Sequence, residues 1–232
     1  GIADARPMPR SVVRNGAPRC PRCLLPPRWC VCAGLEPVAL PLAVDILMHA
    51  EEAHRPSSTG HLIDRVVPHT RVHRIGRAGL PAPAAVVRPE RELWVLHPLG
   101  DPPPPATDPA RVQVLLLDGS WKQALEMLRV TGRWGRRVAL PMTGPSRYWL
   151  RVQQGDRQFS TAEALIFLLR AVGLTAEAEA LDRQFELHVY ASLCARGKKA
   201  AAQEFLRASP IRTAFPNLLA RLAPNAPRAF GT

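Results

Sequence analysis

The chain has 232 residues, 47% of them hydrophobic, which is enough for one large domain with a sizeable core. No apolar run approaches the roughly 20 residues of a membrane-spanning helix, and the first residues lack the order of a secretory signal. We therefore expect a cytoplasmic protein that does not enter a membrane. The formal net charge is +12 and only three of the 31 basic residues are Lys, which favours a nucleic-acid partner over a merely solvated basic surface.

The N-terminal region contains a cysteine cluster. Residues 1–18 are polar and aperiodic, which predicts a flexible segment. Four cysteines follow within thirteen residues, in two close pairs: Cys20, Cys23, Cys30 and Cys32. Four thiolates at this spacing favour a structural, tetrahedral Zn²⁺ site in a small knuckle over 19–36, which is too short for a core of its own. Two disulfides are the alternative, but they need an oxidising compartment that nothing else indicates.

From residue 37 to residue 208 the pattern is that of an α/β domain. Apolar runs predict four strands, at 38–49, 92–98, 111–118 and 136–141, and Pro98 is expected to end the second. Helical patterns lie within 51–67, 120–130, 160–173, 175–197 and 198–208. Strands that are apolar throughout and alternate with helices predict a mostly parallel sheet flanked by helices. The proline-containing tail, 209–232, is predicted to be irregular.

Local signals define some of these helices further. Ser160 followed by Glu163 has the spacing of a capping box, and Gly173 is expected to end that helix. Cys194, the fifth cysteine, falls on a predicted helix and is interpreted as a small buried hydrophobic residue.

Polar side chains follow the predicted strands at the edge where ligands bind in parallel sheets: His49, His97 and Asp118. Asp118 has several possible roles. It could bind a cation, orient a hydroxyl or act as a general base, or it could only cap the next helix, and the pattern alone favours the cap. Gly119 permits close approach of a ligand, and Ser120 places a hydroxyl at the helix start. Trp121 either stacks on a base or fills the core together with Leu125 and Leu128, and the pattern favours the core.

The segment 57–60, "SSTG", precedes a helix and offers backbone N–H groups to an anion such as a phosphate or carboxylate. This signal is weak by itself. The chain has no P-loop motif, which disfavours an ATPase. His69 and His73 have the spacing of one helical turn, but a second metal site is disfavoured because no acidic residue has convincing ligand spacing.

The segment 144–164 interleaves basic and aromatic residues. Arg147, Tyr148 and Arg151 suit a nucleic-acid groove, and Pro and Gly before them predict a loop. A solvated loop with two core aromatics is the alternative.

Taken together, these segments resemble the DTW-domain family. The matching pieces, in order, are "CPRC…CVC", "ILMHAEEAHRPSSTGHLI", "LWVLHP", "LLLDGSWKQALEM" and "SRYWLRVQQGDRQFSTAEAL". The name-giving motif is Asp118-Gly119-Ser120-Trp121, with Ser in place of Thr. Ser58 and His61 replace a more usual Asn and Arg. The pieces span residues 20 to about 170.

The resemblance implies a tRNA-uridine aminocarboxypropyltransferase with a SPOUT-like fold and a C-terminal knot. It implies transfer of the 3-amino-3-carboxypropyl group of S-adenosylmethionine to N3 of a uridine in tRNA, which forms acp3U and releases 5′-methylthioadenosine. Asp118 and Trp121 would be catalytic, and Arg147, Tyr148 and Arg151 would bind tRNA. The implied cofactor-binding residues are Ser57, Ser58, Thr59, Gly60, His97, Pro98, Asp118, Gly119, Ser120 and Thr161.

Two rival functions remain. A SPOUT-like RNA methyltransferase would use the same cofactor, because pocket geometry decides which carbon is presented to the RNA. A non-catalytic, zinc-containing RNA-binding module would not need the cofactor. No obligate protein partner is indicated.

Overall fold

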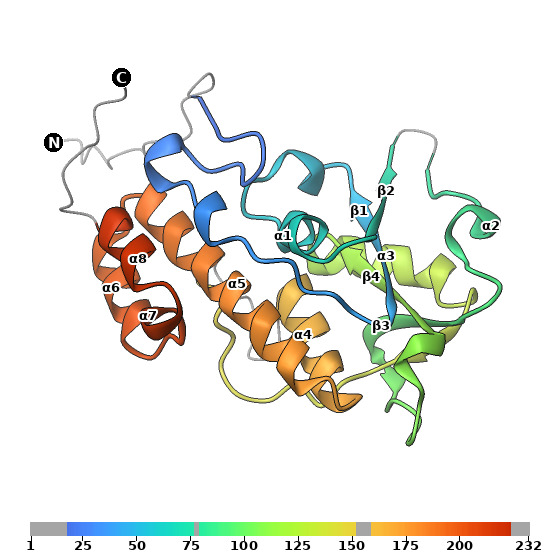
Figure 1. Cartoon of the computed structure of the whole chain (residues 1–232). Coiled ribbons are helices and arrows are strands. Elements are labelled where there is room, and N and C mark those ends of the chain that lie inside the picture. The colour runs from blue at the N-terminus through green and yellow to red at the C-terminus, as the bar shows by residue number, and fades with distance from the viewer. Residues whose placement is uncertain (1–17, 77–78, 152–158, 224–232) are drawn as a thin grey trace, which may run out of the picture.

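The computed structural model describes residues 18–76, 79–151 and 159–223, so the segment predicted to be flexible lies outside it apart from its last residue. Its centre is a parallel sheet in the order β2-β1-β4-β3-β5 (Figure 1). The strands are β1 (Ala43–His49), β2 (Arg71–Ile75), β3 (Glu92–Asp101), β4 (Val112–Asp118) and β5 (Arg136–Val138). The predicted α/β fold with a mostly parallel sheet is confirmed.

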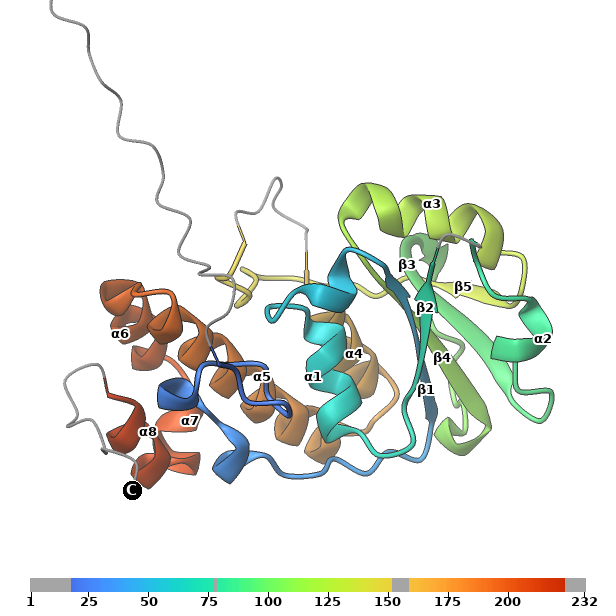
Figure 2. The same ribbon diagram turned by 90° about the horizontal axis from the view of Figure 1, so that it is seen from above.

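Helices cover both faces of the sheet (Figure 2). Their bounds are α1 (Thr59–Val66), α2 (Pro83–Val86), α3 (Trp121–Thr131), α4 (Thr161–Ala171), α5 (Thr175–Ala195), α6 (Lys199–Arg207), α7 (Ile211–Ala214) and α8 (Pro216–Leu222). Alternate strand residues enter two cores: Val114 and Leu116 join the one beneath α1, α4 and α5, and Leu115 joins the one beneath α2 and α3. Asp118 continues the Val114 and Leu116 series, which aims it at α1 and α4.

Local capping chemistry matches the sequence. Ser160 and Glu163 form the predicted capping box of α4, which ends before Gly173 at a φ of +81°. The cap of α3 is Ser120, in a capping box with Gln123, rather than Asp118. The interpretation of Asp118 as only a helix cap is therefore wrong.

Several features of the strands and helices differ from the predictions. Strand β3 was expected to end at Pro98 but continues to Asp101. Its pairing with β5 shifts register between Leu96 and Asp101, and at such an irregularity proline removes no hydrogen bond from the sheet. Strand β2 was not predicted. It lies at the edge of the sheet, where its side chains are partly exposed, so its sequence "RVHRI" lacks the apolar run of a buried strand. His73 lies in β2 rather than on a helix, and its Nε2 is 2.8 Å from Asp45 Oδ1.

The tail predicted as irregular contains two helices. α7 and α8 bury Ile211, Leu218 and Leu222 in the main core. The guanidinium of Arg28, in the cysteine knuckle, donates to the carbonyl oxygen of Arg221 at 2.6 Å. Tertiary packing against the knuckle and α5 thus stabilises helices too short to be stable alone.

The cysteine knuckle includes the 3₁₀ turns η1 (Pro27–Trp29) and η2 (Cys32–Gly34), and it packs against α5. Gln184 Nε2 donates to the carbonyl oxygen of Gly34 at 3.0 Å, and the side chains of Leu25 and Val31 are buried. Cys194 is buried on α5, as expected. In the described parts of the chain, no helix is long and apolar enough to cross a membrane.

Candidate functional site

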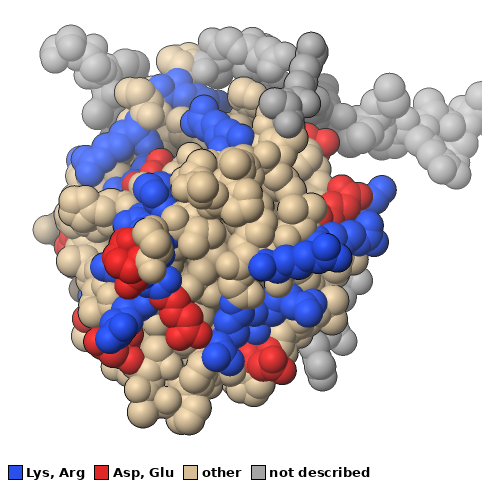
Figure 3. Space-filling model, turned by 90° about the vertical axis from the view of Figure 1, so that its right-hand side faces the viewer, with Lys and Arg blue, Asp and Glu red and all other residues tan. Residues whose placement is uncertain are grey.

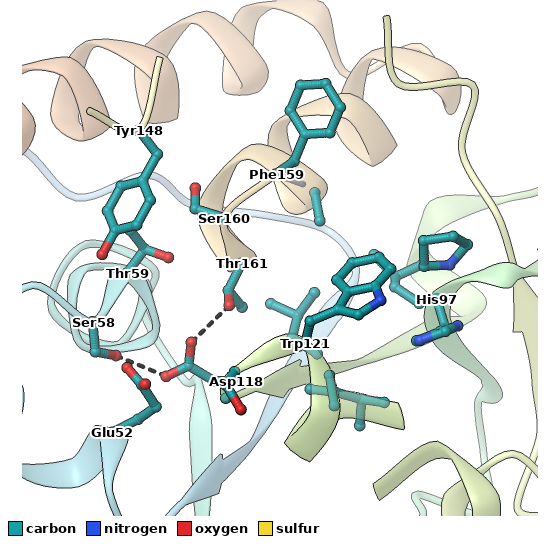
Figure 4. A pocket seen from close by; sticks show the side chains of 18 of the residues that line it. Glu52, Ser58, Thr59, His97, Asp118, Trp121, Tyr148, Phe159, Ser160 and Thr161 are labelled. Atoms are coloured by element: carbon teal, nitrogen blue, oxygen red, sulfur yellow. Dashed lines mark hydrogen bonds between the residues drawn. The ribbon is translucent and has the colours of Figure 1, made fainter. Parts of the chain in front are cut away.

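A cavity of about 310 Å³ opens at the carboxyl edge of the sheet, a volume typical of small-molecule sites (Figure 4). The ends of β3 and β4 and the starts of α1, α3 and α4 surround it. Eleven residues predicted to be functional line it: Ser58, Thr59, His97, Pro98, Asp118, Gly119, Ser120, Trp121, Tyr148, Arg151 and Thr161. Lining residues that sequence reasoning did not single out include Glu52, Arg55, Met142 and Phe159, and Ser160, singled out only as a helix cap, also lines the cavity.

Asp118 lies in the middle of the residues that line the cavity, and it is 4% exposed. Its Oδ2 accepts from Ser58 Oγ at 2.7 Å, and its Oδ1 accepts from Thr161 Oγ1 at 2.6 Å (Figure 4). Burial raises the pKa of Asp118, and the two hydroxyl donors oppose that rise only in part. The geometry therefore holds a buried carboxyl group of increased basicity at the cavity wall.

The helix starts around Asp118 are crowded by its carboxylate. A Cβ atom on Gly60 would stand only 2.5 Å from Asp118 Oδ2, so this position needs a residue without a side chain. Ser58 caps α1, and its Oγ also accepts from the His61 backbone N–H at 3.4 Å. The carboxyl group of Asp118 thus lies directly against the start of α1. Ser57 and Gly60 do not line the cavity, and the cofactor contacts predicted for "SSTG" remain predictions.

One end of the cavity is charged. Glu52, in the 3₁₀ turn η3 (Glu52–His54), is 1% exposed and accepts from Arg55 at 3.0 Å and from Arg151 at 2.5 Å. Tyr148 borders the same end, and its hydroxyl donates to the Ser57 carbonyl oxygen at 2.6 Å. Sequence reasoning missed Glu52 because "EEAHR" has the composition of a solvated loop.

The other end of the cavity is aromatic and apolar. Trp121 is 44% exposed, and its ring centroid lies 5.8 Å from that of His97. The expectation that Trp121 fills the core is wrong, because the first turn of α3 overhangs the cavity. His97 Nδ1 accepts from the Leu99 backbone N–H at 3.1 Å, so in the neutral ring Nε2 carries the proton. Burial, then the charge of Arg137, lowers the pKa of His97.

His97 Nε2 is buried and has no hydrogen-bond partner among the residues that the structure describes. Buried polar atoms normally have a hydrogen-bond partner, so this atom, on a residue that lines the cavity, is a candidate ligand contact.

Two of the three predicted RNA-binding residues are held by acidic side chains. Arg147 Nε and Nη2 donate to the two carboxylate oxygens of Glu186 at 2.7 and 2.8 Å, and its guanidinium lies over the Phe205 ring. This bidentate pair ties the chain before α4 to α5 and α6. Arg151 is bound to Glu52, as described above. RNA binding by these residues remains a prediction, and the loop 152–158 next to them lies outside the described residues.

The four predicted zinc ligands converge. The sulfur atoms of Cys20, Cys23, Cys30 and Cys32 all lie within 4.8 Å of one another, and none is in a disulfide. The Cys20–Cys32 and Cys23–Cys30 separations are 3.5 and 3.7 Å, close to the roughly 3.8 Å between ligands of a tetrahedral zinc–thiolate site. The cluster can therefore hold a metal ion such as zinc, and four thiolates leave no open position for catalysis.

Comparison with known proteins identifies one family. The model of the DTW domain matches residues 17–193, which includes the knuckle, the cavity and most of α5. No solved structure matches the chain.

Proposed function

The chain belongs to the DTW-domain family, and from that premise we propose that it transfers the 3-amino-3-carboxypropyl group of S-adenosylmethionine to N3 of a uridine in tRNA. The family is consistent with a tRNA-modifying transferase. The observation that carries the proposal is Asp118, a buried carboxyl group of raised pKa held by two hydroxyls at the wall of a small-molecule cavity.

In the proposed reaction, N3 of the uracil forms a bond to the donor's γ-carbon while the bond from that carbon to sulfur breaks. The electron pair of the broken bond stays on sulfur, which gives 5′-methylthioadenosine, and the N3 proton leaves to a base. Asp118 is that base. Each of its oxygens receives one hydrogen bond and keeps a second acceptor site, so the carboxylate stays fixed and can still accept a proton.

The aromatic end of the cavity supports recognition of a nucleobase. Trp121 offers an exposed indole face for stacking, and His97 offers the unmatched Nε2–H as a donor. Trp121 thus positions a reacting base or the donor's adenine beside Asp118.

Basic surface supports a tRNA partner. Figure 3 shows several separate groups of Lys and Arg side chains on the side of the molecule that carries α2, with Asp and Glu among them. Together with the net charge of +12, this favours binding of a phosphate backbone. The proposal includes a SPOUT-related knot and the cytoplasm as the place of action. Zinc in the knuckle has a structural role, since it would tie residues 20–32 together next to α5.

The test of the proposal is the identity of the small-molecule product. Unmodified tRNA is incubated with the protein and S-adenosylmethionine, and the nucleoside products are separated by chromatography. We expect 5′-methylthioadenosine, formed only when tRNA is present. S-adenosylhomocysteine would instead favour an RNA methyltransferase, and tRNA binding with neither product would favour a binding module.

A further inference from the structure

The charged end of the cavity is built around a buried carboxylate. Glu52 uses one oxygen for Arg55 and the other for Arg151, and its side chain is 1% exposed. The side chains of Arg55 and Arg151 are 45% and 32% exposed, and both line the cavity that contains Asp118. A buried acid thus orients two guanidinium groups at the edge of the site.

Arg151 retains unused donor capacity. A guanidinium has five N–H donors, and among the described residues Arg151 is seen to give one of them to Glu52. Arg55 also forms a pair with Glu51 at the surface, at 3.4 Å, so its charge is shared by two carboxylates. The charge of Arg151 lowers the pKa of Asp118 against the larger effect of burial, and its guanidinium lies 5.8 Å from the centroid of the Tyr148 ring, which lines the same cavity. Arg151 is therefore the cation best placed to meet an anionic ligand group.

The two ends of the cavity differ in a way that matches one class of ligand. Trp121 and His97 stand at one end, Glu52 lies at the other, and Asp118 lies between them (Figure 4). A nucleoside joined to an α-amino acid has one aromatic end and one zwitterionic end. Asp118 lies against the start of α1, so a second carboxylate placed there would meet a like charge.

We propose that Arg151, held by the buried Glu52 and assisted by Arg55, binds the α-carboxylate of the donor's amino-acid end. This inference rests on the proposed function, in which the amino-acid end is the group that is transferred. It assigns Arg151 to the donor rather than to a tRNA phosphate. Glu52 acts as a positioning residue, since it holds the guanidinium groups and does not touch the donor.

Equilibrium binding of two nucleosides tests the assignment without turnover. S-adenosylhomocysteine carries the amino-acid end, and 5′-methylthioadenosine lacks it. Wild-type protein should bind S-adenosylhomocysteine more tightly, by calorimetry. In Arg151→Gln this affinity should fall by about 10-fold or more, the size expected for a lost charge-assisted hydrogen bond, and the affinity for 5′-methylthioadenosine should stay the same. Arg151→Lys should restore part of the difference, since it keeps the charge.

A matched control is Arg170→Gln, which removes an Arg–carboxylate pair with Asp182 outside the cavity and should change neither affinity. Glu52→Gln should also reduce the difference in affinity between S-adenosylhomocysteine and 5′-methylthioadenosine, as Arg151→Gln does. Thermal unfolding identifies a variant that is not folded, and Arg151→Lys then carries the test.

Other outcomes would overturn the assignment. One is an Arg151→Gln variant that weakens both nucleosides equally or neither. Another is a variant that loses tRNA affinity while the nucleoside difference is unchanged, which would assign Arg151 to phosphate. If the wild type binds both nucleosides but makes no modified uridine, the proposed reaction fails, and the binding difference still decides the role of Arg151.

Discussion

Replacement of Asp118 by Asn should separate activity from stability. The carboxamide has nearly the same shape as the carboxylate. Its oxygen can still accept from one of the two hydroxyl groups, of Ser58 or Thr161, and its NH₂ group can donate to the other hydroxyl once that hydroxyl has rotated. The charge that burial penalises is removed. We therefore expect the free energy of unfolding to change by less than about 1 kcal/mol at pH 7, and in the direction of greater stability. Loss of the base should lower the rate by about 10²- to 10⁴-fold.

The pH dependence of this difference follows from the sign of the pKa shift. The pKa of Asp118 is raised in the folded state, so as pH rises from about 4 the unfolded chain loses its proton first and the wild type loses stability. The carboxamide of the Asp118→Asn variant does not titrate in this range. The stability of the variant relative to the wild type should therefore increase between about pH 4 and the higher folded-state pKa of Asp118. Urea unfolding at several pH values, with single-turnover rates at pH 7, measures both effects. A variant that is active, or one that is inactive because it is unfolded, would refute the reasoning.

Three further predictions concern other parts of the molecule. Gly60→Ala should displace Asp118 and destabilise the fold by about 1–3 kcal/mol. The control, Gly76→Ala, has nothing within 4 Å of the added Cβ and should change stability by less than about 0.5 kcal/mol. Equal effects of the two substitutions in urea unfolding would contradict the close contact between Gly60 and Asp118. Burial lowers the pKa of His188 to about 3, so below its unfolded-state pKa the unfolded chain takes up a proton that the folded chain does not. The free energy of unfolding should therefore fall by about 2 kcal/mol from pH 7 to pH 5. His188→Gln should remove this part of the acid sensitivity, and an unchanged slope would refute it. Elemental analysis should find one zinc per chain, and a chelator should lower the melting temperature; no metal or no change would contradict the knuckle assignment.

Features set by neighbouring residues could be predicted from the sequence. The apolar runs that become β1, β3, β4 and β5 and the capping box of α4 depend on contacts within a few residues or on burial on both sheet faces. The position of Asp118 at the end of β4 followed from the same pattern. These signals were enough to place the site at the carboxyl edge of the sheet.

Features set by distant residues could not be predicted. Glu52 is buried because Arg151, 99 positions later, folds against it, and Arg147 meets Glu186 on another helix. Trp121 has the spacing of a core residue, but the turn that carries it extends beyond the sheet. The helices of the tail form because the knuckle and α5 offer them an apolar surface.

The measurement that tests the account most directly uses S-adenosylmethionine labelled with ¹⁴C in the carboxyl carbon and with ³H in the methyl group. Unmodified tRNA is incubated with the wild-type protein and the doubly labelled donor, and both isotopes are counted in the recovered tRNA. The account predicts that ¹⁴C enters the RNA and ³H stays with the nucleoside product. Incorporation of ³H without ¹⁴C, or of neither isotope, would contradict it.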